Sequence, residues 1–238
     1  MTIPAIKLIT FDGDDTLWNF TSMMRRGIQA VSASIIENLG KGFDYMTPEY
    51  LIHAMSLEIE KHDPQTIDFL EARRITLARC LHEARVGYAD YLADDLIHLY
   101  LGILDERFDF YEGAHTTLEA LFGKIPLGYI TNGTTTPDKV KMDKYFHISV
   151  MPETLNLRKP RREVFLYAAE RAGCQLHEMM HIGDNLYSDI RGALDAGCQA
   201  VWFNPRRRAN DPDITPTAVI HRLSDVLELL PESILNGG

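Results

Sequence analysis

The sequence predicts an α/β protein in which a doubly wound, Rossmann-like parallel sheet forms the core and an all-helical domain is inserted into it. The apolar run Ile6–Thr10 ends in a loop of aspartate and glycine, as a buried strand of a parallel sheet does. From Gly113 onward, strand-like and helix-like segments alternate, which is typical of βαβ units. Between these regions, the sequence has helical periodicity and almost no strand signal.

The alternating part predicts one helix before each later strand and a final helix that Ser224 caps. The expected helices cover residues 114–122, 162–172, 189–195 and 225–230, and the expected strands cover residues 125–130, 179–182 and 199–203. Parallel strands joined in this way place their carboxyl ends at one edge of the sheet, where ligands gather.

The helical insertion follows directly after the aspartate-rich loop. A βα unit takes roughly 30 residues, yet about 100 residues separate the first strand from the next strand-like segment. We therefore assign residues 1–18 and 110–238 to the core and residues 19–109 to the inserted domain. With hinges near Trp18-Asn19 and residues 110–113, such a domain could act as a lid.

Four or five helices are expected in the insertion. Apolar residues recur at helical spacing in residues 28–36 and 67–81, and a further helix is expected over residues 88–104. Thr47 before Pro48 predicts an N-cap followed by proline at the first helical position. Asp63-Pro64 is expected to interrupt the next segment.

The composition points to a globular protein of the cytoplasm. The hydrophobic content of 45% over 238 residues is sufficient for a packed core. No run of 18 apolar residues occurs, and Met1–Pro4 leads into the first strand without the features of a signal peptide. Three cysteines without a CxxC spacing favour buried thiols in a reducing compartment over a disulfide framework.

The charge distribution argues against nucleic acid as a partner, and the lack of a long apolar run argues against a membrane. The formal net charge is -10, whereas counterion release from nucleic acid needs a basic face. The dense basic run Arg206–Arg208 is most simply a solvated loop. The nine histidines show no metal-ligand spacing, and we assign none of them to chemistry. The sequence leaves the oligomeric state open.

The loop after the first strand contains the most distinctive cluster of charges. Asp12, Asp14 and Asp15 are three carboxylates within four residues, and they repel one another unless a cation or a proton accompanies them. Strand geometry places Asp12 and Asp14 where a substrate could meet them. The alternative interpretation is an Asp-Gly turn in which Thr16 caps the following helix.

Two further segments supply groups that suit a phosphoryl ligand. Thr131-Asn132-Gly133 offers a hydroxyl, an amide and a backbone N–H at the end of a strand, although Asn-Gly there is also an ordinary turn. Lys159, before Pro160, could offset charge on a nucleophile and on a transferring phosphoryl group. Arg158 and Arg161 compete for that role.

A last segment, Gly183–Asp189, adds two more carboxylates after a strand. Asp184 falls at the strand end, and Asp189 falls in the first turn of the next helix, where it could also be only an N-cap. Hard oxygen ligands without a nearby set of cysteine and histidine favour Mg²⁺ over zinc or copper.

The order of these motifs strongly resembles the haloacid dehalogenase superfamily, most of whose members are phosphohydrolases. The resemblance covers about residues 5–20 and 110–232, and the helical insertion resembles that family's cap of the first type. Asp-Asp-Thr-Leu-Trp and Ile-Thr-Asn-Gly look most like the branch of nucleotidases and N-acylneuraminate-9-phosphatases.

The resemblance implies a role for each motif residue. Asp12 would attack phosphorus to give an aspartyl-phosphate, and Asp14 would protonate the leaving oxygen and then activate water. Thr131, Asn132 and Gly133 would hold the phosphoryl oxygens, and Lys159 would stabilise charge. Mg²⁺ would bind the Asp12 carboxylate, the Asp14 backbone carbonyl and Asp184. Asp189 would not bind the metal directly but would orient a water molecule on the metal, or Lys159.

One position of the first motif departs from the family pattern. Gly13 replaces the larger apolar residue that is common between the two aspartates, so it should soften the loop or make room beside it. Gly13 and Trp18 are the remaining candidates for contact with phosphate or substrate. Asn19, Arg25 and Arg26 lie near the first hinge, although an amphipathic helix explains the two arginines as well.

The predicted function is therefore a Mg²⁺-dependent phosphatase that acts on a small phosphorylated metabolite, such as a nucleotide or a sugar phosphate. A 2-haloacid dehalogenase is an alternative, but its chemistry has no use for the second carboxylate of Asp14. A phosphomutase shares all four motifs and differs in keeping the phospho-aspartate dry. A binding module without catalysis is the least favoured alternative.

Overall fold

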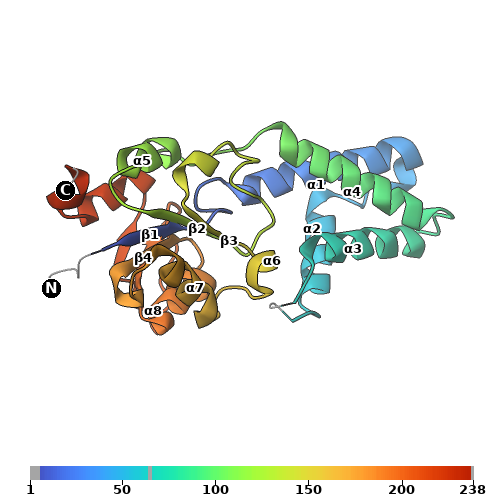
Figure 1. Cartoon of the computed structure of the whole chain (residues 1–238). Helices are drawn as coiled ribbons and strands as arrows, with labels where there is room; N and C mark the ends of the chain where they lie inside the picture. Colours follow the sequence, from blue (N-terminus) through green and yellow to red (C-terminus); the bar gives the residue numbers. More distant parts are fainter. Residues whose placement is uncertain (1–5, 64–65, 237–238) are drawn as a thin grey trace. The chain divides into compact units, whose positions relative to one another are not determined.

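The computed structural model describes residues 6–63 and 66–236, and the chain divides into two compact units (Figure 1). Met1–Asn19 and Phe110–Gly238 form the core unit, and Phe20–Asp109 form the helical unit. The predicted first residues, Met1–Pro4, and the predicted break at Pro64 lie outside the described residues. Within the described part of the chain, every helix is too short or too polar to cross a lipid bilayer.

The core unit is built on a six-stranded sheet in which all neighbouring strands are parallel. The strand order is β3-β2-β1-β4-β5-β6, that of a Rossmann-like fold, which confirms the predicted fold class. The strands are β1 (Leu8–Phe11), β2 (Leu127–Ile130), β3 (Ile148–Val150), β4 (Met179–Gly183), β5 (Gln199–Phe203) and β6 (Ala218–Ile220).

Helices cover both faces of this sheet. The strands carry apolar residues throughout, as strands that are buried on both sides do. Figure 1 shows α7 and α8 on one face and α5 on the other. The helices of the core unit are α5 (Ala114–Leu121), α6 (Pro152–Leu155), α7 (Arg162–Ala172), α8 (Gly192–Ala196) and α9 (Glu232–Leu235). On the α7 face, Phe165 and Ala168 pack with Leu8 and Met179 in one apolar cluster.

The structure agrees with α7 and β5 as predicted and corrects two other elements. The helix expected over 189–195 begins earlier, as a π-helical turn over Leu186–Arg191 that continues into α8. The last predicted helix is a 3₁₀ helix over Leu223–Leu229. Ser224 does not cap it, because Arg222 holds the N-cap position and the Asp225 carboxylate accepts the Arg222 N–H.

The helical unit contains α1 (Phe20–Leu39), α2 (Pro48–Ile59), α3 (Phe69–Glu83) and α4 (Ala89–Glu106), with a 3₁₀ turn at Lys41–Phe43. Thr47 caps α2 by accepting the Tyr50 N–H, and Pro48 is the first helical residue, as predicted. Gly27 of α1 allows a close approach of α4, since a methyl group there would lie 2.6 Å from the Tyr100 ring.

Candidate active site

The carboxyl ends of β1, β2 and β4 bring three predicted site residues to one edge of the sheet. In the sheet register, Phe11 pairs with Tyr129 on one side and with Ile182 on the other. Asp12, Thr131 and Asp184 follow these strands, at the edge where α/β sheets bind ligands. Asp12 is held in line with the sheet because its N–H donates to the Ile182 carbonyl at 2.9 Å.

Lys159 lies between two buried carboxylates at this edge. Its Nζ is 2.6 Å from Asp12 Oδ1 and 2.7 Å from Asp189 Oδ1, and it also donates to the Ile130 carbonyl at 2.6 Å. The Lys159 side chain is only 1% exposed. Of the three basic candidates in this segment, it is Lys159 that contacts Asp12.

Burial and charge act in opposite directions on these three groups. Burial raises the pKa of Asp12 well above its usual range, and Lys159 opposes this shift. Burial also acts to raise the pKa of Asp189, but Lys159 and His181 hold that pKa well below its ordinary value. Burial alone would lower the pKa of Lys159, but the Asp12 and Asp189 carboxylates outweigh this effect, and the pKa of Lys159 is raised. Lys159 is therefore a charged ammonium at neutral pH.

Asp189 is held from several directions at once. Its Oδ2 accepts the Asn185 N–H at 3.0 Å, and its Oδ1 contacts Lys159 and His181. The N-cap of its helix is Asn185, whose side chain accepts the N–H groups of Tyr187 and Ser188. The interpretation of Asp189 as only an N-cap is therefore wrong, and its contacts direct it toward Lys159.

His181 is a member of this network that sequence reasoning missed. Its Nδ1 is 2.9 Å from Thr10 Oγ1, and its Nε2 is 3.4 Å from Asp189 Oδ1. Burial lowers the pKa of His181, which favours the neutral ring. A ring that donates from Nε2 to Asp189 accepts at Nδ1 from the Thr10 hydroxyl. The available signal was a histidine within an apolar strand, paired in register with Thr10.

Asp184 is held by residues of β5 and of the loop that follows it. The Trp202 indole N–H donates to the Asp184 carbonyl at 2.9 Å, and Arg208 Nη2 lies 3.0 Å from Asp184 Oδ2. The basic run was expected to be a solvated loop, and Arg206–Arg208 are exposed in a loop, but Arg208 also contacts Asp184. Asn204 places it, because its side chain bonds both the N–H and the carbonyl of Arg208. Burial raises the pKa of Asp184 to about 7, and Asp189 and Asp15 contribute to the rise.

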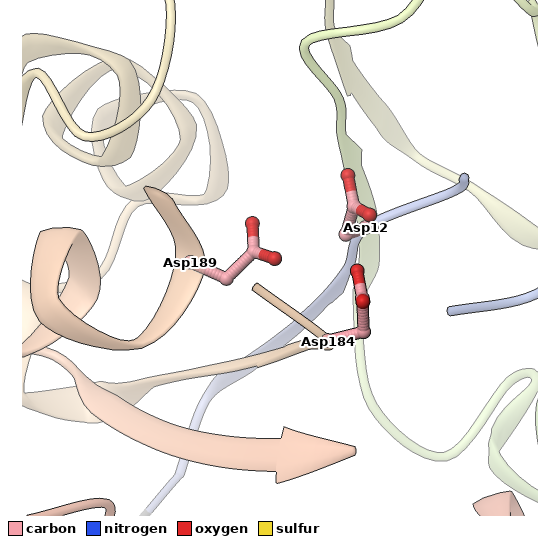
Figure 2. Close-up of side chains that lie close together, drawn as sticks. All are labelled: Asp12, Asp184 and Asp189. Carbon is pink, nitrogen blue, oxygen red and sulfur yellow. The ribbon is translucent and has the colours of Figure 1, made fainter. Parts of the chain in front are cut away.

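The Asp12, Asp184 and Asp189 carboxylates converge closely enough to hold a cation. One oxygen atom of each lies within 4.8 Å of the others, and Figure 2 shows the three side chains around a common space. An all-oxygen set suits a hard divalent cation.

The Asp14 side chain, in the loop after β1, lies beside Gly133. The Trp18 indole N–H donates to Asp14 Oδ1 at 2.7 Å. A methyl group at Gly133 would collide with Asp14 Oδ2. The Gly133 N–H itself donates to Thr131 Oγ1 at 2.9 Å. Asp14 and the loop after β2 therefore face the same space.

Asn132 has a different position from the one expected for a phosphate ligand. Its side-chain nitrogen donates to the Lys159 carbonyl at 2.9 Å, and its side-chain oxygen accepts the Lys159 N–H at 2.8 Å. Both polar ends of the amide are thus engaged with the Lys159 backbone. Asn132 fixes the segment that carries Lys159.

Trp18 and Gly13 form a packed arrangement with Tyr129 instead of a surface for a ligand. Trp18 is fully buried, contrary to its expected contact with substrate, and its ring stacks on Tyr129 at a centroid distance of 6.2 Å. A methyl group at Gly13 would collide with the Tyr129 hydroxyl. Gly13 thus makes room in the loop.

Thr16 and Arg26, two residues near the first hinge, have contacts within the protein. Helix α1 begins at Phe20, so Thr16 is not at its N-cap, and the Thr16 hydroxyl instead lies 3.4 Å from Asp12 Oδ2. Arg26 donates to Asp109 at 2.7 Å and to the Arg107 carbonyl at 2.7 Å, which ties the two ends of the helical unit together.

The comparisons with known proteins identify the family of this chain. The haloacid dehalogenase-like hydrolase family matches residues 6–197. The chain is 31% identical to 5-amino-6-(5-phospho-D-ribitylamino)uracil phosphatase YigB of Escherichia coli K12, over 94% of this chain and 96% of the relative. It is 26% identical to pyrimidine 5'-nucleotidase YjjG of the same strain, over 93% of this chain and 96% of the relative.

A solved structure with the same fold is a 2-haloacid dehalogenase from Pseudomonas syringae pv. Tomato DC3000. It is 31% identical, has a TM-score of 0.74, and covers 94% of this chain and 97% of its own. The chain therefore belongs to the haloacid dehalogenase-like hydrolases and is an enzyme of that family, which confirms the resemblance inferred from the motifs.

Proposed function

We propose that this protein is a Mg²⁺-dependent phosphatase that hydrolyses a small phosphate monoester through an aspartyl-phosphate on Asp12. The observation that carries this proposal is the pair of carboxylates in one loop. Asp12 contacts Lys159 at 2.6 Å, while Asp14 lies beside Gly133 and the Thr131 hydroxyl. A nucleophile and a separate acid are what a phosphate ester needs, whereas halide displacement needs only the nucleophile.

The first chemical step transfers the phosphoryl group to the enzyme. An Asp12 oxygen bonds to phosphorus as the bond from phosphorus to the leaving oxygen breaks, and Asp14 gives that oxygen a proton. Lys159 offsets charge on Asp12 and on the phosphoryl oxygens. The Thr131 hydroxyl accepts the Gly133 N–H and would donate its own proton to a phosphoryl oxygen, so the expected direct contact of the Gly133 N–H with phosphate is replaced by a contact that positions Thr131.

The second step regenerates the enzyme. Water attacks phosphorus of the aspartyl-phosphate, Asp14 takes the proton from that water, and the bond between phosphorus and Asp12 breaks. Inorganic phosphate then leaves, with Asp12 again a free carboxylate. Asp189 keeps Lys159 charged and in place through both steps, because the two groups are 2.7 Å apart in a buried site.

The acidic residues suit a bound divalent cation. Asp12, Asp184 and the Asp14 backbone carbonyl would hold it, in line with the convergence of the carboxylate oxygens within 4.8 Å. When bound, Mg²⁺ would neutralise charge between the phosphate dianion and the carboxylates. Asp12, Asp184, Asp189 and a phosphate dianion together carry about -5, and Lys159 supplies only +1 within this buried group.

The site and the relatives support a substrate class. The site handles one phosphoryl group, and two relatives are named for the phosphate esters of a nucleotide and of a ribitylaminouracil. We therefore expect a phosphorylated small metabolite, with neither nucleic acid nor membrane as partner, and with specificity set by the helical unit acting as a cap. Three free, buried cysteines are in keeping with a cytoplasmic location.

Phosphate release with and without Mg²⁺ tests the proposal. Wild type should hydrolyse 4-nitrophenyl phosphate and members of a panel of phosphorylated metabolites, and chelation should abolish turnover. Asp12→Asn should lower kcat by at least about 1000-fold, because the nucleophile is lost. No turnover by wild type, or retained turnover by Asp12→Asn, would contradict the phosphatase.

A 2-haloacid dehalogenase is the second candidate, because the solved dehalogenase is 31% identical to this chain. Halide release from 2-chloropropionate in the same preparations separates the two. The phosphatase predicts no halide release, and it predicts that Asp14→Asn impairs phosphate release. Halide release that persists without Mg²⁺ and in Asp14→Asn would establish the dehalogenase instead.

A further inference from the structure

We propose that Trp18 is a positioning residue that fixes which oxygen of Asp14 delivers the proton to the leaving group. The proposal rests on the proposed function, in which Asp14 is the general acid. Trp18 belongs to the same loop as Asp14 and is fully buried, so it acts through Asp14 and does not contact substrate. The oxygen that it selects is Oδ2.

The hydrogen bond between the two side chains sets the orientation. Trp18 Nε1 donates to Asp14 Oδ1 at 2.7 Å. An indole N–H is a donor only, so its partner must offer a lone pair, and the carbonyl oxygen of a carboxylic acid is the better acceptor. When Asp14 is protonated, the proton therefore resides on Oδ2.

The position of Oδ2 gives this choice a chemical consequence. A methyl group at Gly133 would collide with Oδ2 and would lie 3.3 Å from Thr131 Oγ1. Oδ2 thus faces the loop after β2, which the proposed function assigns to the phosphoryl group. Trp18 therefore holds the acidic proton on the side where the leaving oxygen departs.

The indole cannot easily turn away from this position. Its ring stacks on Tyr129 at 6.2 Å and meets the edge of Phe110 at 6.4 Å. Gly13 leaves the space that the ring fills, because a methyl group there would lie 2.8 Å from the indole. The loop also closes on itself, since the Asp15 N–H donates to the Trp18 carbonyl at 2.7 Å. A rigid donor in turn limits rotation of the Asp14 carboxyl group.

The role of Trp18 in proton delivery can be tested by comparing kcat/KM for two substrates of similar shape. The leaving group of 4-nitrophenyl phosphate departs without a proton, whereas the alkoxide of 4-nitrobenzyl phosphate needs one. In Trp18→Phe, kcat/KM should fall by about 10- to 100-fold for the benzyl ester and by less than about 3-fold for the phenyl ester. The ratio of the two values within one preparation is independent of the fraction of folded enzyme.

The second tryptophan provides a matched control. The Trp202 indole N–H donates to the Asp184 backbone carbonyl at 2.9 Å, not to the general acid. Trp202→Phe removes the same chemical group and should change kcat/KM for both esters by the same factor. Asp14→Asn should show the benzyl-selective loss more strongly than Trp18→Phe, because it removes the acid itself.

A second variant covers failure of Trp18→Phe to fold. In the Trp202→Phe background Trp18 is the one remaining tryptophan, so a benzothiophene analogue of tryptophan can replace it selectively. That ring keeps the shape of the indole and lacks the N–H. It should reproduce the benzyl-selective loss while keeping the wild-type unfolding temperature to within a few degrees.

The outcomes separate this inference from the proposed function. A benzyl-selective loss supports the positioning role. Equal losses for the two esters, in a background where wild type hydrolyses both, overturn the inference and leave the phosphatase intact. Failure of wild type to hydrolyse either ester overturns the proposed function, and the inference with it.

Discussion

A buried charge cluster of the core unit and an exposed ion pair of the helical unit show how burial changes the role of charge. In the core, Lys159, Asp12 and Asp189 contact one another while buried. In the helical unit, Arg74 and Glu71 form an ion pair with side chains that are 33% and 47% exposed. Burying ions is costly, whereas exposed pairs cost little and contribute little. The cluster around Lys159 is thus arranged for chemistry, whereas the Arg74–Glu71 pair contributes little to the stability of the helical unit.

Removal of the buried ammonium should give the largest effect. Lys159→Met leaves Asp12 and Asp189 close together without their shared cation. We expect the free energy of unfolding of the core unit to fall by about 3–5 kcal/mol, as measured by urea denaturation followed by circular dichroism. The matched control is Arg191→Met, at an exposed pair with Asp195, which should change it by less than about 1 kcal/mol. If the two substitutions lowered the free energy of unfolding equally, buried and exposed ion pairs would not differ in their contribution to stability.

An intermediate effect is expected from helix packing in the other unit. Gly27→Ala places a methyl group 2.6 Å from the Tyr100 ring and 2.7 Å from Leu104, so it should destabilise the helical unit by about 1–3 kcal/mol. Gly102→Ala, in α4, meets nothing within 4 Å and should stabilise it by about 0.5–1 kcal/mol through helix propensity. Thermal unfolding of both variants checks the signs. A shift in the same direction for both would show that packing does not decide stability there.

The smallest effect is expected from the exposed pair. Arg74→Ala should change the free energy of unfolding by no more than about 0.5 kcal/mol, and 1 M NaCl should erase even that difference. Paired urea denaturation curves at low and high salt give the measurement. A loss of more than about 1.5 kcal/mol would show that surface charge, not only packing, holds the helical unit together.

Elements with clear ends could be predicted well from the sequence. Helix α7 ends as predicted, where Gly173 adopts a left-handed conformation with φ of 69°. Strands β3 and β6 were missed because each has three residues, too few for a periodic pattern. Both lie at the edges of the sheet, where burial constrains the sequence least.

Part of the site could be predicted because it follows from strand ends, whereas Lys159 and Asp189 were predicted from the order of the motifs. Asp12, Thr131 and Asp184 come directly after strands, so their convergence follows from the fold. The contact of Arg208 with Asp184 depends on the path of the loop between β5 and β6. A run of three arginines in the sequence does not indicate that path. The burial of Trp18 depends on Tyr129, a residue far along the chain that stacks on it.

The fit of Tyr129 over Gly13 has a consequence for how this loop can diverge. A bulkier residue at position 13 meets the Tyr129 hydroxyl, and a shorter residue at position 129 leaves a void beside Gly13. Each replacement alone is unfavourable, and a smaller residue at position 129 relieves the contact with Tyr129 but not the contact of position 13 with the Trp18 indole. Positions 13, 18 and 129 are therefore epistatic, and an exchange of this loop for one with a large central residue requires compensating changes at Trp18 and Tyr129 together.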